Sequence, residues 1–226
     1  KAKEDKNIKG VLFVVNSPGG AVAPSVELAY AIKELKEIKP IVVYASGVIA
    51  SGSYYASIWA NKIIANPGSI VGSIGVIMQG VNTEELMQKI GVSTQTVKAG
   101  KYKESGTPTR KWFDYEEKQL QSVIDDTYNM FISDVASARN LDVKNHTIFA
   151  DAKIFTSKQA KNVGLIDEVA TLSYAQESLI KLSKVEKPVW SKEDKFEKFM
   201  NKFMSEAISN ISMSLLSGLK AYWFIF

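Results

Sequence analysis

Two residues in separate motifs could carry nucleophilic chemistry: Ser51 within IASGSYYAS and Lys103 within KAGKYKESG. The sequence has no cysteine and a single histidine, His146, whose neighbours Asn145 and Thr147 are not acids. A serine hydroxyl becomes a useful nucleophile when a base takes its proton. Lysine can be that base when burial lowers its pKa from about 10.4 toward neutrality. A Ser/Lys pair would make the chain a hydrolase, whereas His146 is more typical of a surface or capping residue.

The surroundings of Ser51 allow two interpretations. It is predicted to follow a strand and open a helix, where unpaired N–H groups and the helix dipole favour negative charge. Serine is also a common helix cap, and a near copy of the motif occurs at Ser46. The pattern is not GxSxG, because Ile49 stands two residues before Ser51 and Ser53 two after it. Taken alone, Ser51 is more simply explained as a cap.

A glycine turn at Pro18, Gly19 and Gly20 is predicted between a parallel strand and a helix, which is where α/β folds place ligand sites. Glycine lets the backbone approach a ligand closely, and the N–H of Gly20 could donate to a developing oxyanion. A tight turn with no further role is the alternative. Neither a Walker lysine nor GxGxxG is present, which disfavours phosphate binding.

Lys103 belongs to a lysine cluster with Lys98 and Lys101. Such a cluster is normally a solvated surface. A neighbouring positive charge would nonetheless help to lower the pKa of any member that was buried, whereas Glu104 would raise it if it pointed inward.

Strand-like and helical patterns alternate along residues 10–183. Residues 10–17 (GVLFVVNS) are continuous and β-branched, which is typical of a buried parallel strand. Apolar residues then recur at helical spacing over residues 26–38, and residues 40–46 (PIVVYAS) give a second buried strand. This is a βαβ unit with an expected right-handed crossover.

The alternation continues to the end of that region. The predicted elements are a helix over 50–60, strands near 62–67 and 69–78, a short helix over 82–90, a strand over 93–100, a long amphipathic helix over 114–140, a capped helix over 156–164, a strand over 165–170 and a helix over 172–183. The predicted fold class is α/β, with residues 1–183 as one domain.

Residues 184–226 form a predicted C-terminal amphipathic tail, with apolar residues at steps of three and four over 196–215. Packing on its own domain or on another subunit is the more common use of such a helix, and a membrane-surface helix is the alternative. Five polar residues make a spanning helix unfavourable: Ser209, Ser212, Ser214, Ser217 and Lys220.

Composition narrows the function classes. Apolar residues make up 46% of the 226 and charged residues 23%, as in soluble globular proteins. The net charge of +4 comes from interleaved acids and bases and does not favour nucleic-acid binding. The absence of cysteine excludes thiol catalysis, disulfides and thiolate metal sites.

Four motifs in this order resemble the signal peptide peptidase A family of bacteria, also called protease IV or peptidase family S49. They are NSPGG at 16–20, ASGSYYAS at 50–57, GSIGVIM at 72–78 and KAGKYKESGTP at 98–108. The similarity extends over about residues 8–169. The resemblance implies a ClpP/crotonase-like fold and a Ser/Lys dyad. Carried over by position, Ser51 is the nucleophile, Lys103 the general base, and Ser73 the hydroxyl that orients the lysine. The N–H groups of Gly20 and Gly52 are the oxyanion donors.

The resemblance also implies an endopeptidase for hydrophobic peptides, such as remnant signal peptides, with no metal or cofactor. It implies a ring-shaped homo-oligomer at the bacterial cell membrane, with the catalytic domain on the extracytoplasmic side. The chain begins at Lys1, so a fragment or processed product that lacks an N-terminal membrane anchor is expected. The family often has glycine at the position of Ser53, a change that should be tolerated.

Two alternatives remain open at this point. A crotonase-like acyl-CoA enzyme would need a carboxylate near the glycine turn, and the nearest downstream acid is Glu27. A non-catalytic membrane-associated oligomeric scaffold would use the amphipathic tail as its working part.

Overall fold

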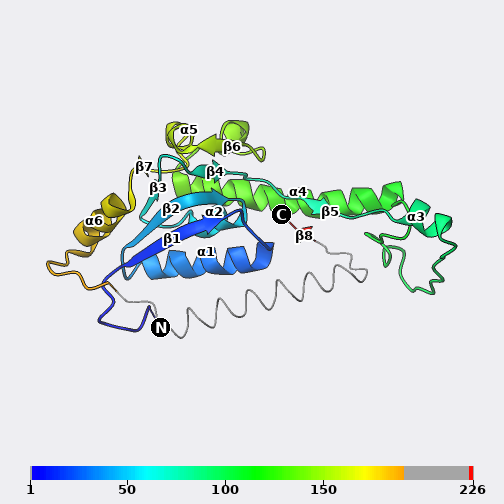
Figure 1. Ribbon diagram of the computed structural model, residues 1–226, viewed down its shortest axis with the longest axis horizontal. Coiled ribbons are helices and arrows are strands. Elements are labelled where there is room, and N and C mark those ends of the chain that lie inside the picture. The colour runs from blue at the N-terminus through cyan, green and yellow to red at the C-terminus, as the bar shows by residue number, and fades with distance from the viewer. Residues whose placement is uncertain (1, 191–223, 226) are drawn as a thin grey trace.

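The computed structural model describes residues 2–190 and 224–225. A six-stranded sheet forms the centre of a body flanked by helices, and one long helix continues out of that body (Figure 1). In chain order the elements are β1 (Val11–Ser17), α1 (Val22–Lys36), β2 (Ile41–Ala50), α2 (Gly52–Ser57), β3 (Lys62–Ala65), β4 (Ile70–Gly72), β5 (Met78–Gln79), α3 (Glu84–Lys89), α4 (Asp114–Arg139), the 3₁₀ helix η1 (Val143–Ile148), β6 (Ile154–Thr156), α5 (Ser157–Asn162), β7 (Glu168–Val169), α6 (Leu172–Ser183) and β8 (Phe224–Ile225). The predicted α/β class is confirmed.

Strand β2 is the axis of the sheet. β1 pairs with it in parallel on one side, whereas β3 pairs with its first half and β4 with its second half on the other side. The change of partner falls at Ser46 and Gly47, between the paired residues Ala45 and Val48. β7 extends the sheet beyond β3, and β6 closes it beyond β4 in the antiparallel sense. Three parallel strands, β1, β2 and β4, therefore end side by side.

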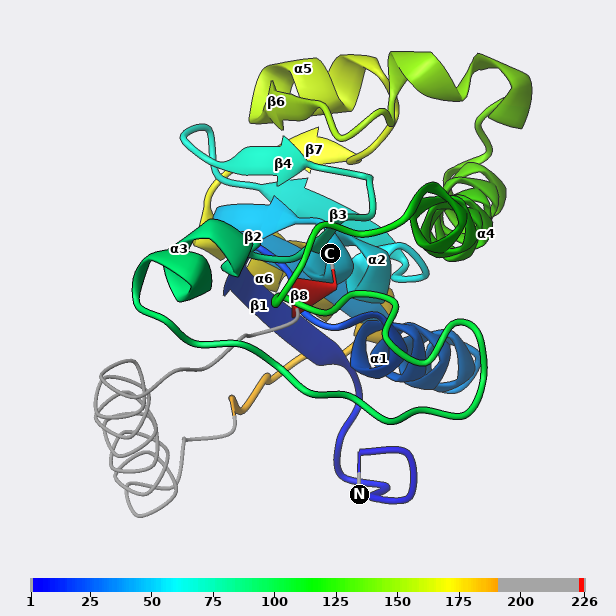
Figure 2. The same ribbon diagram turned by 90° about the vertical axis from the view of Figure 1, so that its right-hand side faces the viewer.

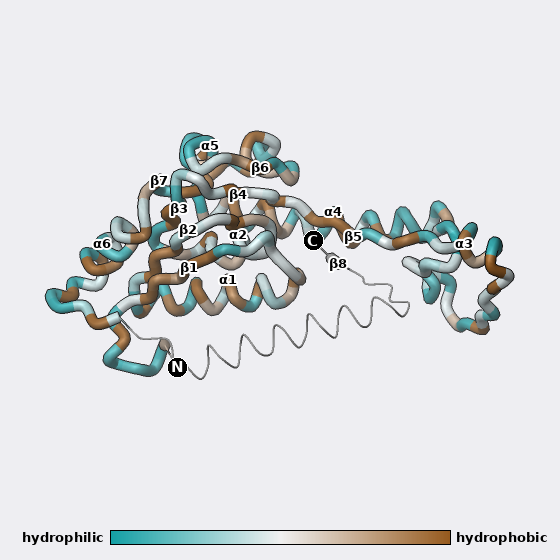
Figure 3. The backbone as a smooth tube through the Cα atoms, in the orientation of Figure 1, coloured by the Kyte–Doolittle hydropathy of each residue, from teal (hydrophilic) through white to brown (hydrophobic). Residues whose placement is uncertain are grey.

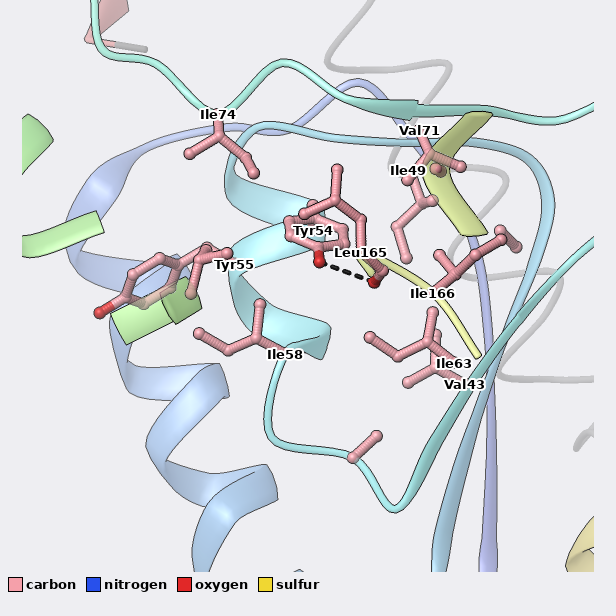
Figure 4. Close-up of a cluster of buried hydrophobic side chains, with 14 of the residues drawn as sticks. Val43, Ile49, Tyr54, Tyr55, Ile58, Ile63, Val71, Ile74, Leu165 and Ile166 are labelled. Carbon is pink, nitrogen blue, oxygen red and sulfur yellow. Dashed lines mark hydrogen bonds between the residues drawn. The ribbon is translucent and has the colours of Figure 1, made fainter. Parts of the chain in front are cut away.

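The alternation of side chains along β2 divides the core in two. Val43 and Ala45 join the large apolar cluster with residues of α1, α2 and α4, whereas Val42 and Tyr44 pack with α6 on the opposite face. Figure 4 shows the large cluster, in which the fully buried Tyr54 donates a hydrogen bond of 2.7 Å to the Leu165 carbonyl. Helices thus cover both faces of the sheet (Figure 2).

Strand β1 differs from its prediction. It was expected to be buried, but within β1 only Val15 is buried and the Val14 side chain is 51% exposed. The reason is its position, because among the strands that the structure describes β1 pairs with β2 alone and forms an edge of the sheet. A run of β-branched residues is compatible with both edge and central strands, so the pattern could not distinguish them.

Helix α4 has two unlike halves. Phe131, Ile132 and Val135 are buried in the body, whereas between Asp114 and Met130 only Glu116 is buried. The first half leaves the body together with α3 and the loop between them (Figures 1 and 3). We call residues 81–123 the arm.

The strand predicted over residues 93–100 does not form. Those residues are irregular and exposed, and Val97 is completely exposed. A strand needs a neighbour for its backbone hydrogen bonds, and the arm offers none at this place. The prediction was wrong because β propensity alone does not supply a partner.

Most of the predicted tail helix, residues 191–223, lies outside the described residues. The chain's described end, β8, pairs antiparallel with β5. Among the helices that the structure describes, none is long and apolar enough to span a bilayer.

Candidate active site

The candidate site lies where β1, β2 and β4 end. The amide of Ser51, which directly follows β2, donates a hydrogen bond of 2.8 Å to the carbonyl of Gly72 at the end of β4. Ser17, at the end of β1, is in register with Ile49 of β2. The carboxyl edge of parallel strands is the usual place of ligand sites in α/β folds. Three loops that are far apart in the sequence therefore meet at Ser51.

Ser51 occupies a strained turn between β2 and α2. Its φ of 50° and ψ of −127° lie outside the conformations that residues with a Cβ usually adopt, and the residue is only 6% exposed. Such strain is typical of functional sites, where the surrounding structure holds it in place. The near copy, Ser46, lies within β2 and donates to the Val15 carbonyl instead. Of these two serines, only Ser51 stands at the start of a helix.

Gly19 fits against Ser51 so closely that no side chain could replace its hydrogen. Its φ is +116°, and a Cβ added there would lie 2.8 Å from the Ser51 Cβ and 2.9 Å from the Gly52 nitrogen. Both contacts are shorter than real Cβ atoms make. The glycine turn after β1 is thereby fitted to the backbone around the serine.

The backbones of Gly20 and Gly52 lie close together beside Ser51. A Cβ placed on Gly52 would lie 3.2 Å from the Gly20 nitrogen, so the two backbones are in close approach. Gly52 begins α2, where the first N–H groups have no partner within the helix. No hydrogen bond donated by the Gly20 amide is found among residues 2–190. Two N–H groups are therefore available next to the serine.

Two further serines support this turn. The Ser53 hydroxyl accepts a hydrogen bond of 2.9 Å from the Ala50 amide and donates one of 2.7 Å to the Ser17 carbonyl. It thus ties the Ser51 turn to the end of β1, a role that the sequence did not indicate. Ser73 follows the Gly72 carbonyl that binds Ser51, and its own amide donates to Lys153 at 2.7 Å. Ser73 therefore follows directly on the residue whose carbonyl binds the Ser51 amide, and its expected role in orienting the lysine stays a prediction.

An open groove of about 420 Å³ adjoins these residues, between β1, α1 and α2. It is lined by Phe13, Val14, Val15, Asn16, Ser17, Gly19, Gly20, Ala21, Pro24, Ser25, Leu28, Gly52, Ser53 and Ala56. No carboxylate is among them, and Glu27 is not part of its lining. The groove is suited to apolar side chains and lacks the acid that acyl-CoA chemistry would use.

Lys103 is not brought to Ser51 within this chain. It lies exposed on the arm, in a loop whose Lys101 carbonyl accepts a long hydrogen bond of 3.5 Å from the Tyr115 hydroxyl. Tyr55 of the Ser51 helix instead packs edge-on against Phe131, with ring centroids 4.9 Å apart. Tyr115 and Phe131 are 16 residues apart on α4, or about 24 Å at a rise of about 1.5 Å per residue. The sequence could not indicate this separation.

Ion pairs organise the Lys103 loop. Glu104 pairs with Lys98 and, at 3.5 Å, with Arg110. Arg110 makes a two-pronged ion pair with Glu116, with both N···O distances 2.8 Å. Hydrogen bonding to Arg110 lowers the pKa of Glu116 to about 2, so this buried carboxylate is charged at neutral pH. No motif in the sequence indicated the pairing of Arg110 with Glu116, although Glu116 stands in an acidic run typical of a helix start.

The remaining polar candidates lie elsewhere. His146 sits in η1, where its Nδ1 is 3.1 Å from the Val143 carbonyl and its ring faces Tyr128. Within the described part of the chain, no three His, Asp or Glu side chains are grouped as metal ligands.

Fold and site define the class of this molecule: an α/β protein with a mostly parallel sheet, whose polar site lies at the carboxyl ends of the parallel strands. Residues 33–186, more than half of the chain, match peptidase family S49. This chain belongs to that family. Ser51, Ser73 and Lys103 lie within the matched residues, whereas the glycine turn precedes them.

Individual relatives agree with the family. "Putative protease MJ0651" of Methanocaldococcus jannaschii is 45% identical over 82% of this chain and 60% of its own length. "Putative signal peptide peptidase SppA" of Enterococcus faecium is 37% identical over 83% of this chain and 54% of its own length. "Serine protease SPPA, chloroplastic" of Arabidopsis thaliana is 34% identical over 76% of this chain and 26% of its own length. The chain spans about 60% or less of these relatives.

One solved structure is also similar in outline. A point mutant of ClpP1 from Listeria monocytogenes matches 75% of this chain and 81% of its own, with a TM-score of 0.45 and 14% identity.

Proposed function

We propose that this chain is the catalytic domain of a serine endopeptidase, with Ser51 as nucleophile and Lys103 as general base. The observation that carries the proposal is the close approach of the Gly20 and Gly52 backbones beside the strained Ser51 turn. Preorganised N–H groups at that place stabilise the oxyanion of an acyl-transfer reaction. Membership in a peptidase family supports the same chemistry.

In the proposed reaction the neutral Lys103 amine takes the proton of Ser51 as its Oγ attacks the peptide carbonyl carbon. The Gly20 and Gly52 N–H groups bind the resulting oxyanion. The Lys103 ammonium then gives its proton to the departing amine, leaving an acyl-serine ester. Water, deprotonated by the same amine, hydrolyses that ester and restores Ser51. Ser73 orients the amine.

Because Lys103 lies on the arm, we propose that it reaches the Ser51 of a second copy of the chain. Its exposure on a segment that leaves the body is suited to that role. A head-to-tail contact of this kind repeats around a closed ring, in which each copy gives one lysine and receives another. This places the proposed dyad between subunits of a homo-oligomer.

The proposed substrates are hydrophobic peptides in extended conformation, such as signal peptide remnants. The apolar groove beside Ser51 and the open edge of β1 support an apolar, strand-like ligand. Such peptides arise at membranes, so we propose that the enzyme works at the extracytoplasmic face of the cell membrane.

Mixed oligomers test this proposal. Ser51→Ala and Lys103→Ala should each lower hydrolysis of an unstructured apolar peptide by about 10³-fold or more, as loss of a catalytic unit does. Co-expressed in equal amounts, the two inactive variants should regain activity at about one quarter of the sites in a head-to-tail ring. Ser46→Ala is the matched control and should stay active.

The outcomes separate the parts of the proposal. Activity retained by either single variant would show that the dyad is wrong. If both single variants are inactive and their mixture is inactive too, the proposed dyad stands, but its assembly between subunits is refuted.

A further inference from the structure

The arm contains an ionic chain that runs from Lys98 through Glu104 and Arg110 to Glu116. Glu116, at the end of this chain of ion pairs, is buried. The Glu116 side chain is 0% exposed, whereas its neighbour Glu117 is exposed. Elsewhere the fully buried large side chains are apolar or, in Tyr54, hydrogen-bonded by a hydroxyl. The arm is therefore built around a buried charge.

A buried ion pair is a poor source of stability. Removing a charge from water carries a desolvation penalty, which the attraction within the pair offsets only when the geometry of the pair is good. What a forked Arg–carboxylate pair provides is a fixed geometry, because the two parallel N–H···O bonds allow a single arrangement. The Phe113 amide also donates to Glu116 at 2.9 Å, which fixes the carboxylate to the start of α4. The pair thus joins the loop to a rigid helix.

The Arg110–Glu116 ion pair is connected to Lys103 through Glu104. Arg110, held by Glu116, pairs with Glu104, the residue directly after Lys103. The Thr107 amide donates to the Glu104 carbonyl at 3.0 Å, so the backbone at Glu104 is held as well. With Glu104 turned toward Arg110 and Lys98, Lys103 is left exposed on the arm.

We infer that Glu116 and Arg110 are positioning residues that set the place of the Lys103 amine. The inference rests on the proposed role of Lys103. Neither residue touches the reacting atoms in this scheme. Their ion pair holds the loop in the conformation in which the arm presents the amine to a serine, and a misplacement of about 1 Å is enough to reduce turnover about 100-fold.

The test compares two neighbouring acids of α4. Glu116→Gln removes the buried charge but keeps an oxygen for the Phe113 amide, and Glu117→Gln removes an exposed charge from the same turn. We expect Glu116→Gln to lower kcat by about 10- to 100-fold with KM within about twofold, since it acts on positioning. Glu117→Gln should remain within about twofold of the unmodified chain.

Two readouts separate positioning from general damage. Circular dichroism and oligomer mass should be unchanged in Glu116→Gln. Co-expression with Ser51→Ala should restore activity, because the Ser51→Ala subunits bring an intact arm while the Glu116→Gln subunits bring an intact serine. Arg110→Lys keeps the positive charge but loses the two-pronged hydrogen bonding to Glu116, and it should show the same kcat defect. This variant replaces Glu116→Gln in the test if Glu116→Gln fails to fold.

Wild-type kcat in both Glu116→Gln and Arg110→Lys, with Lys103→Ala inactive, would overturn the inference and leave the proposed function standing. An active Lys103→Ala would overturn both. In a third outcome, Ser51→Ala subunits restore activity when mixed with Lys103→Ala but not when mixed with Glu116→Gln. Glu116 would then have a structural role only.

Discussion

The body and the arm hold the two residues of the proposed dyad by different means. In the body, Ser51 is held by apolar burial, strand pairing and glycines that leave no free space around its backbone. On the arm, Lys103 is exposed and its loop is held by ion pairs. A buried nucleophile requires a single backbone conformation. A residue that acts on another subunit requires a rigid support at the surface.

The largest expected effect lies in the body, at Gly19. Gly19→Ala forces a Cβ to 2.8 Å from the Ser51 Cβ at a φ of +116°, so the turn must move. A shift of about 1 Å in the serine should lower kcat/KM about 100-fold or more. Gly68→Ala is the control, because Gly68 is exposed and a Cβ there meets only the Asn66 Oδ1, at an ordinary contact distance of 3.5 Å. Steady-state assays of both variants check this, and equal activities would mean that the close fit at Gly19 is not needed.

The two halves of α4 should differ in their contribution to stability. Phe131→Ala removes a ring that is 2% exposed and should lower the free energy of unfolding by about 3–5 kcal/mol. Val123→Ala, at a side chain 45% exposed in the arm, should change it by less than about 0.5 kcal/mol. Urea denaturation measures both. Similar losses would show that the arm packs against something more than solvent.

A smaller effect is expected at Tyr54 in the body. Tyr54→Phe keeps the ring but leaves the buried Leu165 carbonyl without its hydrogen bond, which should cost about 1–3 kcal/mol. Tyr30→Phe is a suitable control, since Tyr30 is 50% exposed. The same denaturation measurements apply, and an unchanged Tyr54→Phe would imply that another donor reaches Leu165.

The smallest effect concerns the arm at acid pH. Because Arg110 holds the pKa of Glu116 at about 2, below the value of about 4.3 expected in an unfolded chain, its pairing contributes stability above the unfolded value. That contribution should be lost as the pH falls through about 4 to 2. Carbon-detected NMR of the Glu116 carboxyl checks the midpoint, and a midpoint at or above the unfolded value would contradict the buried pair. Arg110→Lys should raise the midpoint.

Some elements could be predicted from the sequence because their causes are local. The helix of residues 114–140 was predicted within one residue of α4, since its apolar period and acidic first turn lie within the segment itself. The capped helix after Thr156 was confirmed, with the Thr156 side chain accepting from the Gln159 amide. The order of four short motifs was enough to indicate the family.

Other features depended on which distant segments became neighbours. That β1 is an edge strand, that residues 93–100 find no strand to pair with, and that β2 exchanges β3 for β4 follow from the free energy of whole-sheet packing. Residue periodicity does not encode these choices, because one apolar run suits several partners.

For the site, the sequence by itself determined which residues are candidates for the proposed chemistry: Ser51, Lys103, Ser73 and the glycines at 20 and 52. Only the tertiary structure decided that the serine and the two amides meet at the ends of parallel strands while the lysine stands on the arm. The physical reason is that side-chain chemistry belongs to each residue, whereas distance is set by strand pairing, helix length and ion pairs between residues far from both.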